Sequence, residues 1–484
     1  MKDMKAETSR SRGTRVRIAA GAAALLATVG LGGCTSKPER DAAKAAPQWN
    51  ILFILADDMA WNQVGYHGTT FYETPNIDGL ARAGISFSDA YAAAPICSPT
   101  RASLMTGKHP ARLHLTDFIP GADFPYARLK VPEWAKSLPL EETTIAEALK
   151  PKGYVSGHFG KWHLNVDTQY QPGRPMDPGS QGFDVVFTSQ KPSSDDDPTK
   201  DAHHVAEITE HALRFLEQNR DRLFFAYVTH HVVHRPVMEH PELVAKYAAK
   251  AGAKLPENNP VMGAMIERMD SSTGELLRKL DQLGISDRTV VVFYSDNGGM
   301  RQLQDQKPLR GGKAMLYEGG IRVPLAVRWP GVITAGTRSS VPVTSTDLFP
   351  TFLEIAGLEP GATPLDGESL VPLFKQAGTL RREALYWHYP HYHHLDEDLA
   401  PSGAIRQGDL KLIEWFEKAA QGRDRSVSLF NLKDDMSEQH DLAGEMPQKA
   451  AELLEKLRVW RKAVGAQEMT PNPGYDPKRA REKT

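Results

Sequence analysis

The chain has 484 residues, which suits one large domain with a smaller one appended to it. Hydrophobic residues make up 40% of the chain, so a packed core is feasible and wholesale disorder is disfavoured. Its 58 basic and 60 acidic residues give a formal net charge of −2, which lacks the basic footprint of nucleic-acid binders. We therefore expect no nucleic-acid partner. The net charge does not exclude a locally basic pocket that binds an anion.

The first 33 residues have the pattern of an export signal. Basic residues between Arg10 and Arg17 precede an apolar run, Ile18–Leu31, that is too short and too rich in small residues for a membrane span. The run ends in Leu31-Gly32-Gly33-Cys34, which resembles the lipobox of bacterial lipoproteins. An ordinary cleaved signal with an incidental cysteine is the alternative.

The lipobox resemblance implies that the signal (1–33) is removed and that Cys34 is lipidated. Residues 34–48, rich in Ala, Lys and Pro, then form a tether. Thr35 is not the Asp that usually marks inner-membrane retention. We therefore expect an exported protein of the periplasm or cell envelope, anchored to the outer membrane by its lipid. The chain has two cysteines, Cys34 in the lipobox-like run and Cys97 in a second modification motif described below. Their separate motifs argue against a disulfide between them.

Short apolar runs rich in β-branched and aromatic residues are typical of strands buried on both faces of a parallel sheet. The clearest are Ile51–Leu55, Leu223–Val228, Thr289–Tyr294 and Val323–Val327. Amphipathic helical patterns lie between them, over Ala202–Arg220, Met262–Leu283 and Asp347–Ala356. The alternation of strands and helices predicts an α/β sandwich.

The composition changes after Phe374. Ala404–Trp415 and Val427–Asn431 read as short antiparallel strands, and Ala450–Ala463 reads as an amphipathic helix. We interpret residues 376–466 as a smaller C-terminal subdomain of antiparallel sheet plus helix. The tail, 467–484, is polar and rich in Pro, so we expect it to be loose.

Polar clusters follow four of the predicted strands. They are Asp57-Asp58 after Ile51–Leu55, Asp296-Asn297 after Thr289–Tyr294, His230, His231 and His234 after Leu223–Val228, and Lys161 and His163 after Val155–Phe159. In open α/β sheets, ligands bind just beyond the carboxyl ends of strands. The sequence therefore predicts one rim that carries all four clusters.

Four of these side chains, Asp57, Asp58, Asp296 and Asn297, offer oxygen ligands. Carboxylates crowded together repel one another unless a cation lies between them. Oxygen-only ligands favour calcium or magnesium over zinc. Each pair taken alone is more often a turn or a helix cap, so spacing by itself does not settle the question.

The most specific motif is Cys97-Ser98-Pro99-Thr100-Arg101, followed by Ser103-Leu104-Met105-Thr106-Gly107. It resembles the signature of type I (formylglycine-dependent) sulfatases, C-x-P-x-R followed by x-S-L-x-T-G. A buried cysteine ahead of a proline-led helix would explain Cys97 but not the whole match. If this segment opens a helix, the helix N-terminus also favours an anion.

The similarity to this arylsulfatase-like family extends over residues 49 to about 442. The further stretches that carry it are Thr74–Asp78, Gly160–Leu164, Ser295–Gly299, Leu309–Lys313, Tyr317–Pro324, Leu429–Leu432 and Glu438–Leu442. The resemblance implies an alkaline phosphatase-like fold, in which helices sandwich a large, mixed, mostly parallel sheet. We place that catalytic domain at 49–375.

The resemblance also implies the nucleophile and the metal site. In the family a maturation enzyme oxidises the cysteine to formylglycine, whose aldehyde hydrates to a geminal diol with a nucleophilic hydroxyl. That cysteine is Cys97 here, with Arg101 beside it. Asp57, Asp58, Asp296 and Asn297 would bind one divalent cation, usually calcium, together with the formylglycine. The cation would hold a sulfate oxygen and lower the pKa of the nucleophile.

The remaining catalytic roles are implied in the same way. Lys161 and Lys313 would bind sulfate oxygens, and Lys313 would assist the leaving group. His234 would bind substrate and protonate the departing alcohol oxygen, and His163 would deprotonate the formylglycine sulfate hemiacetal to expel sulfate. The family motif selects His234 because it stands just before x-Pro, which leaves His230 and His231 for structural or substrate-lining roles.

Two neighbouring charges, Glu318 and Arg322, are four residues apart, and we interpret them as a structural pair. Specificity in such enzymes comes from loops, and the candidate segments are Asp117–Lys136, Lys191–His204 and Tyr386–His394. We expect hydrolysis of sulfate monoesters of carbohydrate, or of aryl sulfates. Phosphate or phosphonate ester hydrolysis on the same fold is one alternative, and an inactive glycan-binding lipoprotein is another.

Overall fold

A computed structural model describes residues 48–166, 170–361, 364–395, 399–422 and 426–483. The predicted export signal and Cys34 lie outside the described residues. Within the described ranges, no helix is both long enough and apolar enough to cross a membrane.

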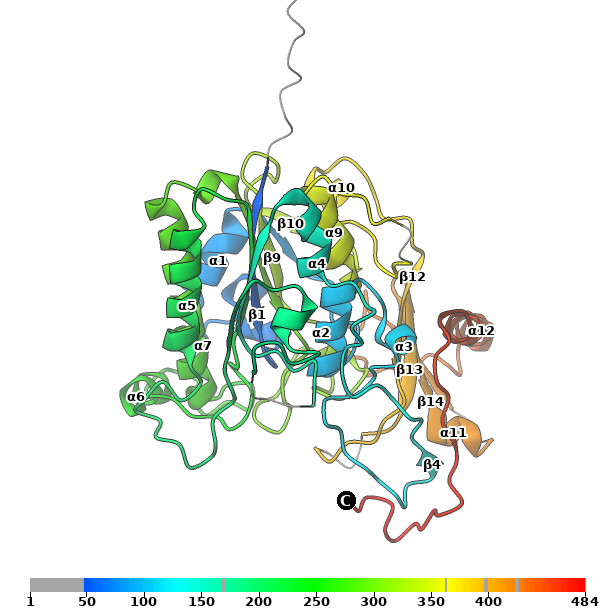
Figure 1. Cartoon of the computed structure of the whole chain (residues 1–484). Helices are drawn as coiled ribbons and strands as arrows, with labels where there is room; N and C mark the ends of the chain where they lie inside the picture. Colours follow the sequence, from blue (N-terminus) through cyan, green and yellow to red (C-terminus); the bar gives the residue numbers. More distant parts are fainter. Residues whose placement is uncertain (1–47, 167–169, 362–363, 396–398, 423–425, 484) are drawn as a thin grey trace, which may run out of the picture. The chain divides into compact units, whose positions relative to one another are not determined.

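One large sheet runs through the centre of the molecule (Figure 1). In the described part of the chain it has eight strands, in the order β10-β2-β9-β8-β1-β7-β5-β6. Their bounds are β10 (Thr337–Ser339), β2 (Ile85–Phe87), β9 (Leu325–Arg328), β8 (Thr289–Ser295), β1 (Asn50–Ala56), β7 (Phe224–Thr229), β5 (Val155–Gly160) and β6 (Val185–Thr188). The strands from β8 to β6 are mutually parallel, whereas β9 is antiparallel to both neighbours. The predicted mixed, mostly parallel sheet is confirmed.

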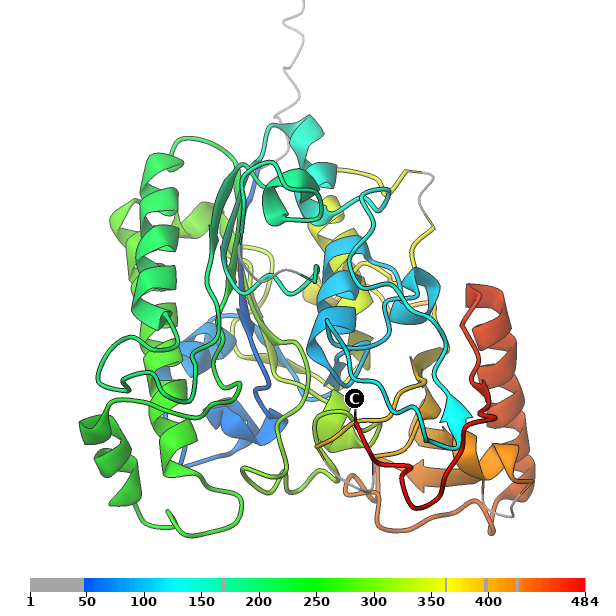
Figure 2. The ribbon, with the colours of Figure 1, turned by 60° about the horizontal axis from the view of Figure 1, so that its bottom comes forward.

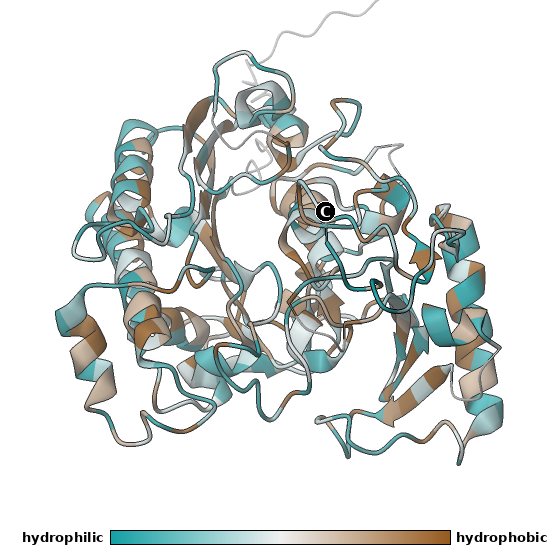
Figure 3. Ribbon diagram, turned by 90° about the horizontal axis from the view of Figure 1, so that it is seen from below, coloured by the Kyte–Doolittle hydropathy of each residue, from teal (hydrophilic) through white to brown (hydrophobic). Residues whose placement is uncertain are grey.

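Alternate residues of β1 point to opposite faces of the sheet, and both faces are buried. Ile51, Phe53 and Leu55 pack in one core with α2 (Cys97–Thr106), α4 (Ile145–Leu149) and α9 (Leu348–Ile355). Leu52 and Ile54 pack in a second core with α1 (Pro75–Arg82), α5 (Val205–Gln218) and α7 (Pro260–Gln282). The helices thus cover both faces, with their hydrophilic sides outward (Figures 1 and 3).

Short elements fill the connections. They are β3 (Ala90–Tyr91), which pairs with β11 (Val343–Thr344), and the helices α3 (Pro110–Leu113), α6 (Pro241–Ala248), α8 (Glu318–Ile321) and α10 (Val371–Phe374).

The prediction that Val323–Val327 forms a strand of a parallel sheet was wrong in both bounds and direction. The strand begins at Leu325 and is antiparallel to β8. The chain leaves β8 at the carboxyl-end edge and continues to α8 without a long crossover helix. It therefore enters β9 from the same edge, because a parallel return would first have to cross back to the opposite edge of the sheet.

A smaller antiparallel sheet follows, as predicted. It has the order β12 (Ala384–Tyr389), β13 (Ser402–Gln407), β14 (Leu410–Trp415) and β15 (Val427–Asn431), and α11 (Phe416–Ala420) follows β14. Helix α12 (Pro447–Val464) buries Leu453 and Leu457 against Ile405, Leu412 and Leu429 of this sheet. The boundaries drawn at 375 and 466 stay predictions.

The tail expected to be loose is instead held by pairing. β16 (Thr470–Pro471) pairs with β4 (Leu129–Lys130), and the guanidinium of Arg128 donates to the hydroxyl of Tyr475. Figure 2 shows this last segment crossing in front of the smaller sheet. Local composition indicated a polar, Pro-rich segment correctly, but it carried no information about a partner strand far away in the sequence.

A buried network of charges joins the smaller sheet to α8. Lys411 of β14 contacts Glu318 at 2.8 Å and Glu438 at 2.9 Å, and all three side chains are buried. Arg322 contacts Glu318 at 3.2 Å, so the predicted Glu318–Arg322 pair is present as part of this network. Burial opposes the charge of Glu318, but Lys411 and Arg322 hold its pKa at about 2.

We predict that Lys411→Met destabilises the fold by about 3–5 kcal/mol, because it leaves two buried carboxylates without their shared cation. Equilibrium unfolding in denaturant measures this loss. Lys433→Met is the matched control, since Lys433 is an exposed lysine of the same region. Equal stability of the two variants would contradict the assigned role.

Candidate active site

Four adjacent parallel strands end at one edge of the large sheet. In the order β8-β1-β7-β5 they are followed by Asp296, Asp57, His230 and Lys161. The backbone joins these ends: the Asp296 amide donates to the Ala56 carbonyl, and the Lys161 amide donates to the Thr229 carbonyl. The predicted rim therefore exists because these strands are neighbours in the sheet.

Cys97 is the first residue of α2, and its buried thiol points into this rim. Its Sγ lies 3.4 Å from Asp57 Oδ1, 3.8 Å from Asp58 Oδ1 and 3.5 Å from Lys313 Nζ. Burial raises the pKa of the Cys97 thiol. As encoded, Cys97 is thus a protonated thiol and a poor nucleophile at neutral pH.

Each carboxylate of the rim is paired with a different cation. Lys161 Nζ lies 2.6 Å from Asp57, and Lys313 Nζ lies 2.7 Å from Asp58. The third, Asp296, accepts a hydrogen bond from Arg101 Nε at 2.9 Å, and Arg101 Nη2 lies at ion-pair distance, 2.8 Å, from the same carboxylate oxygen. Arg101 also donates to the Lys161 carbonyl at 2.9 Å, so it braces the rim from behind and does not line the cavity.

These pairings set the charge state of the rim. Burial opposes the charge of Asp57, but Lys161, His234 and Arg101 lower its pKa well below the usual range. Burial and the neighbouring Asp57 carboxylate raise the pKa of Asp296 to about 7, despite Arg101. Burial disfavours the charged form of Lys313, but Asp58 and Asp57 together raise its pKa, so its ammonium group keeps its protons.

The two predicted catalytic histidines are oriented by backbone carbonyls. His163 Nε2 donates to the Ile119 carbonyl at 2.7 Å, which leaves Nδ1 buried and without a hydrogen-bond partner. His234 Nδ1 donates to the Arg235 carbonyl at 2.6 Å, and its Nε2 lies 3.9 Å from Asp58. Burial and Lys313 lower the pKa of His234 to about 3, and burial and Lys161 lower that of His163. Both rings are therefore neutral, each with one free nitrogen that can take up a proton.

The other two histidines after β7 are separated by the structure. His230 is buried against α7 and contacts Ser272 Oγ at 3.2 Å. His231 lines the cavity and contacts the carbonyl and the hydroxyl of Ser189, both at 3.0 Å. His231 thus links the segment after β7 to the segment after β6.

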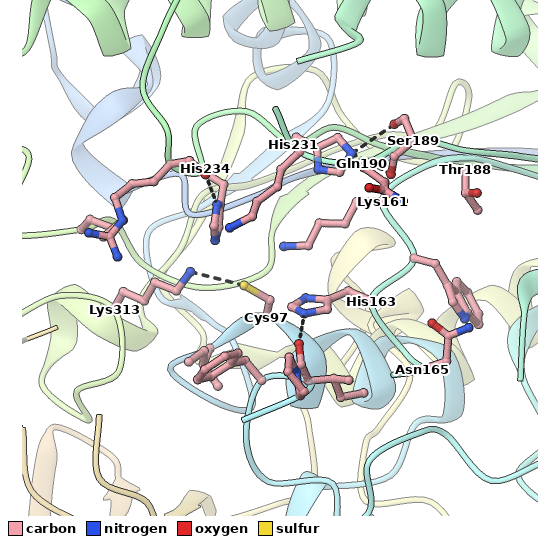
Figure 4. Close-up of a pocket in the computed structure, with 18 of the residues that line it drawn as sticks. Cys97, Lys161, His163, Asn165, Thr188, Ser189, Gln190, His231, His234 and Lys313 are labelled. Carbon is pink, nitrogen blue, oxygen red and sulfur yellow. Dashed lines mark hydrogen bonds between the residues drawn. The ribbon is translucent and has the colours of Figure 1, made fainter. Parts of the chain in front are cut away.

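A cavity of about 410 Å³ opens above Cys97, and Figure 4 shows Lys161, His163, His234 and Lys313 around the sulfur. The three segments proposed for specificity each contribute to its wall, through Phe118 to Pro120, Lys191, and His393 and His394. Most of Asp117–Lys136 and Lys191–His204 lies outside the wall.

Some lining residues were not predicted. Asn165, Tyr170 and Met300 belong to no recognisable motif, so local sequence gave no signal for them. Arg235 and Ser98 occupy variable positions of motifs, Arg235 between His234 and Pro236 and Ser98 in C-x-P-x-R. The contacts of Ser98 show what such a position can do. Its Oγ accepts from the Ile119 amide at 3.1 Å, and the Ile119 carbonyl holds His163, so this hydroxyl connects α2 to the histidine through one loop residue.

Comparison with known proteins agrees with this geometry. The family model described as Sulfatase matches residues 49–358. The chain belongs to the sulfatase family. It therefore hydrolyses sulfate esters, and the alkaline phosphatase-like fold expected of it is confirmed. A second model, N-sulphoglucosamine sulphohydrolase, C-terminal, matches residues 312–463 and spans the smaller sheet and α12.

Three relatives illustrate the range of similarity. Arylsulfatase A of Homo sapiens is 29% identical over 84% of this chain and 86% of its own length. N-acetylgalactosamine-6-sulfatase of Homo sapiens is 32% identical over 71% of this chain and 69% of its own length. The crystal structure of Ps i-CgsB in complex with k-i-k-neocarrahexaose has a TM-score of 0.70 at 25% identity, and covers 88% of this chain and 94% of that chain.

Membership of the family implies a metal ion and a formylglycine, and the residues present fit both. Ligand atoms of Asp57, Asp58, Cys97 and Asp296 lie within 4.8 Å of one another. Asn297 Oδ1 is buried beside them without a hydrogen-bond partner, which is the state expected of a cation ligand. Oxygen donors with a net negative charge suit a hard divalent cation.

We predict that calcium added to metal-stripped protein raises the melting temperature. At a hundredfold excess over the dissociation constant the stabilisation is about 2.7 kcal/mol. Asn297→Ala should reduce this shift, because it removes one oxygen ligand. Thermal unfolding with calcium, with magnesium and without metal checks both points.

The matched control is Asn219→Ala, a buried asparagine whose Nδ2 donates to Phe215 at the end of α5. This variant should keep the full calcium shift. An undiminished shift in Asn297→Ala, or no shift with either cation in the unaltered protein, would contradict the site.

Proposed function

We propose that the sulfate esters hydrolysed by this chain are those of carbohydrates, with formylglycine made from Cys97 as the nucleophile and calcium as the cation. The cavity above Cys97 is the observation that carries the proposal. Its volume of about 410 Å³ exceeds the needs of a sulfate group and lies in the range of small-molecule sites. Two of the relatives described above have sugars in their names.

The base of the cavity supplies the groups that sulfate ester cleavage needs. The bound cation would hold a sulfate oxygen and favour ionisation of the nucleophile. Lys161 and Lys313 present ammonium groups beside Cys97, and these would bind the other sulfate oxygens. Lys313 is also the protonated group at 3.5 Å from the sulfur, so it can support the leaving oxygen.

The two histidines would move protons at defined atoms. His234 presents Nε2, and the negative charge of an entering sulfate ester would favour its protonation, which arms it to protonate the leaving alcohol. His163 presents Nδ1 as a neutral base close to Cys97, suited to the proton removal that releases sulfate. The maturation enzyme would read the C-x-P-x-R motif, in which Arg101 is buried once the chain has folded. Conversion of Cys97 would therefore precede folding.

A phosphate or phosphonate ester hydrolase would use the same arrangement of cations. Parallel kinetics on sulfate and phosphate monoesters and on phosphonate monoesters distinguish the two, and we expect the highest kcat/KM on sulfate. The complete set of catalytic residues in the cavity argues against the alternative of an inactive glycan-binding lipoprotein. Unmodified Cys97 in protein from the native cell would favour that alternative.

We predict that Cys97→Ala abolishes sulfatase turnover and leaves the fold intact. The thiol is small and accepts no backbone bond, so its loss costs the fold little, whereas no other group can replace the nucleophile. Turnover of 4-nitrophenyl sulfate and the circular-dichroism melting curve measure the two effects. Substantial residual activity would overturn the mechanism.

We also propose that the chain is exported and lipid-anchored through Cys34 in the outer membrane, on the strength of Leu31-Gly32-Gly33-Cys34. Cys34→Ser should move the protein from the membrane fraction to the soluble fraction and leave kcat unchanged, so it also serves as the cysteine control for Cys97→Ala. Persistence in the membrane fraction would contradict the lipid anchor.

A further inference from the structure

The mouth of the cavity carries positive charge that the chemistry at its base does not use. Lys191 follows β6 and Arg235 follows β7, and both line the same cavity as Cys97. In the part of the chain that the structure describes, neither has a carboxylate within ion-pair distance. Lys161 and Lys313 differ in this respect, because Asp57 and Asp58 pair with them.

The wall offers little negative charge to balance these two cations. Asp177 is the acidic residue among the described residues that line the cavity. Its carboxylate is already occupied, because it accepts from Arg174 at 2.8 Å and from the side-chain amide of Asn165. The mouth is therefore a region of net positive charge. It lies above the carboxylates at the base of the cavity, which require a divalent cation of their own.

The electrostatic consequence is visible on two lining residues. Burial, then Lys161 and Lys313, lower the pKa of Lys191, and Arg235 adds to the effect. Burial and His394, with Lys313 and Arg235, lower the pKa of His393 to about 3. Several cations thus face one space, and an anion in that space would be attracted by all of them.

The segments that carry the two cations are held in place. The contacts of His231 with the carbonyl and the hydroxyl of Ser189 fix the chain two residues before Lys191. His234 binds the Arg235 carbonyl, and His203 Nε2 contacts the Pro236 carbonyl at 3.0 Å. Backbone anchoring of this kind preorganises a binding site and lowers the cost of ordering it around a ligand.

We infer that Lys191 and Arg235 form a second anion subsite, so that the preferred substrates carry a carboxylate or another sulfate in addition to the ester that is cleaved. The cavity that these residues share with Cys97 has a volume of about 410 Å³, which is in the range of small-molecule sites. Guanidinium and ammonium groups bind carboxylate and sulfate oxygens through the same charge-assisted hydrogen bonds. This inference rests on the proposed carbohydrate specificity and narrows it to acidic sugars.

The experiment measures binding in the Cys97→Ala background, where no ester is consumed. Isothermal titration calorimetry compares N-acetylgalactosamine 6-sulfate with its 4,6-disulfate, and with the disaccharide in which a uronate is attached to it. The comparison of the 6-sulfate with the 4,6-disulfate tests the effect of a second sulfate. The comparison of the 6-sulfate with the disaccharide tests the effect of a carboxylate. We expect at least one doubly charged member to bind about tenfold more tightly than the monosulfate, the gain from one charge-assisted hydrogen bond.

Lys191→Gln and Arg235→Gln should each remove most of that preference. Lys200→Gln is the matched control, because Lys200 belongs to the same segment, is 80% exposed and lies outside the cavity wall. The control loses the same charge and should keep the preference. A preference that survives in both cavity variants, or its absence from the Cys97→Ala parent in both pairs, would overturn the second anion subsite.

Turnover of 4-nitrophenyl sulfate by the unaltered, formylglycine-bearing protein is measured alongside. This ester has no second anion, so its hydrolysis reports on the sulfatase chemistry alone. Turnover without any preference among the sugars would contradict the second anion subsite but not the proposed sulfatase mechanism. A preference among the sugars without turnover would contradict the proposed mechanism but not the subsite.

Discussion

Three carboxylates buried within a few ångströms of one another form the constraint on which the site depends. Asp57, Asp58 and Asp296 can remain together only if cations compensate them, since unpaired buried charge costs several kcal/mol. The compensation comes from Lys161, Lys313 and Arg101, which three separate segments supply. The same contacts that make the carboxylates tolerable therefore also aim two ammonium groups at Cys97 and hold α2 against the ends of the strands.

The parts of this arrangement that a sequence reveals are those with a local or periodic signal. Buried strands are recognisable from their apolar runs, and polar residues directly after Ile51–Leu55 and Thr289–Tyr294 must then lie at one edge if the strands are parallel. Cys97 was identified by a motif. The direction of β9, the role of Ser98 and the pairing of Thr470 were not predictable in this way, because each depends on a partner distant in sequence.

The cavity separates chemistry from selection. At its base, the groups around Cys97 come from strand ends that the sheet fixes, and they act on a sulfate whatever is attached to it. At its mouth, Phe118, Lys191, Arg235 and His394 come from connecting segments, whose sequences can change without disturbing the sheet. This division explains why the sequence motifs identify the reaction class but do not identify the substrate.

The pairing of β16 with β4 bears on how the protein folds. β4 belongs to the loop that begins with Phe118 and Ile119, so one wall of the cavity is tied to a segment more distant along the chain than almost any other. Closing so long a loop costs chain entropy, which the surrounding packing must offset. One wall of the cavity therefore depends on the last segment of the chain, so the substrate side of the site can be completed only after residue 471 has been synthesised.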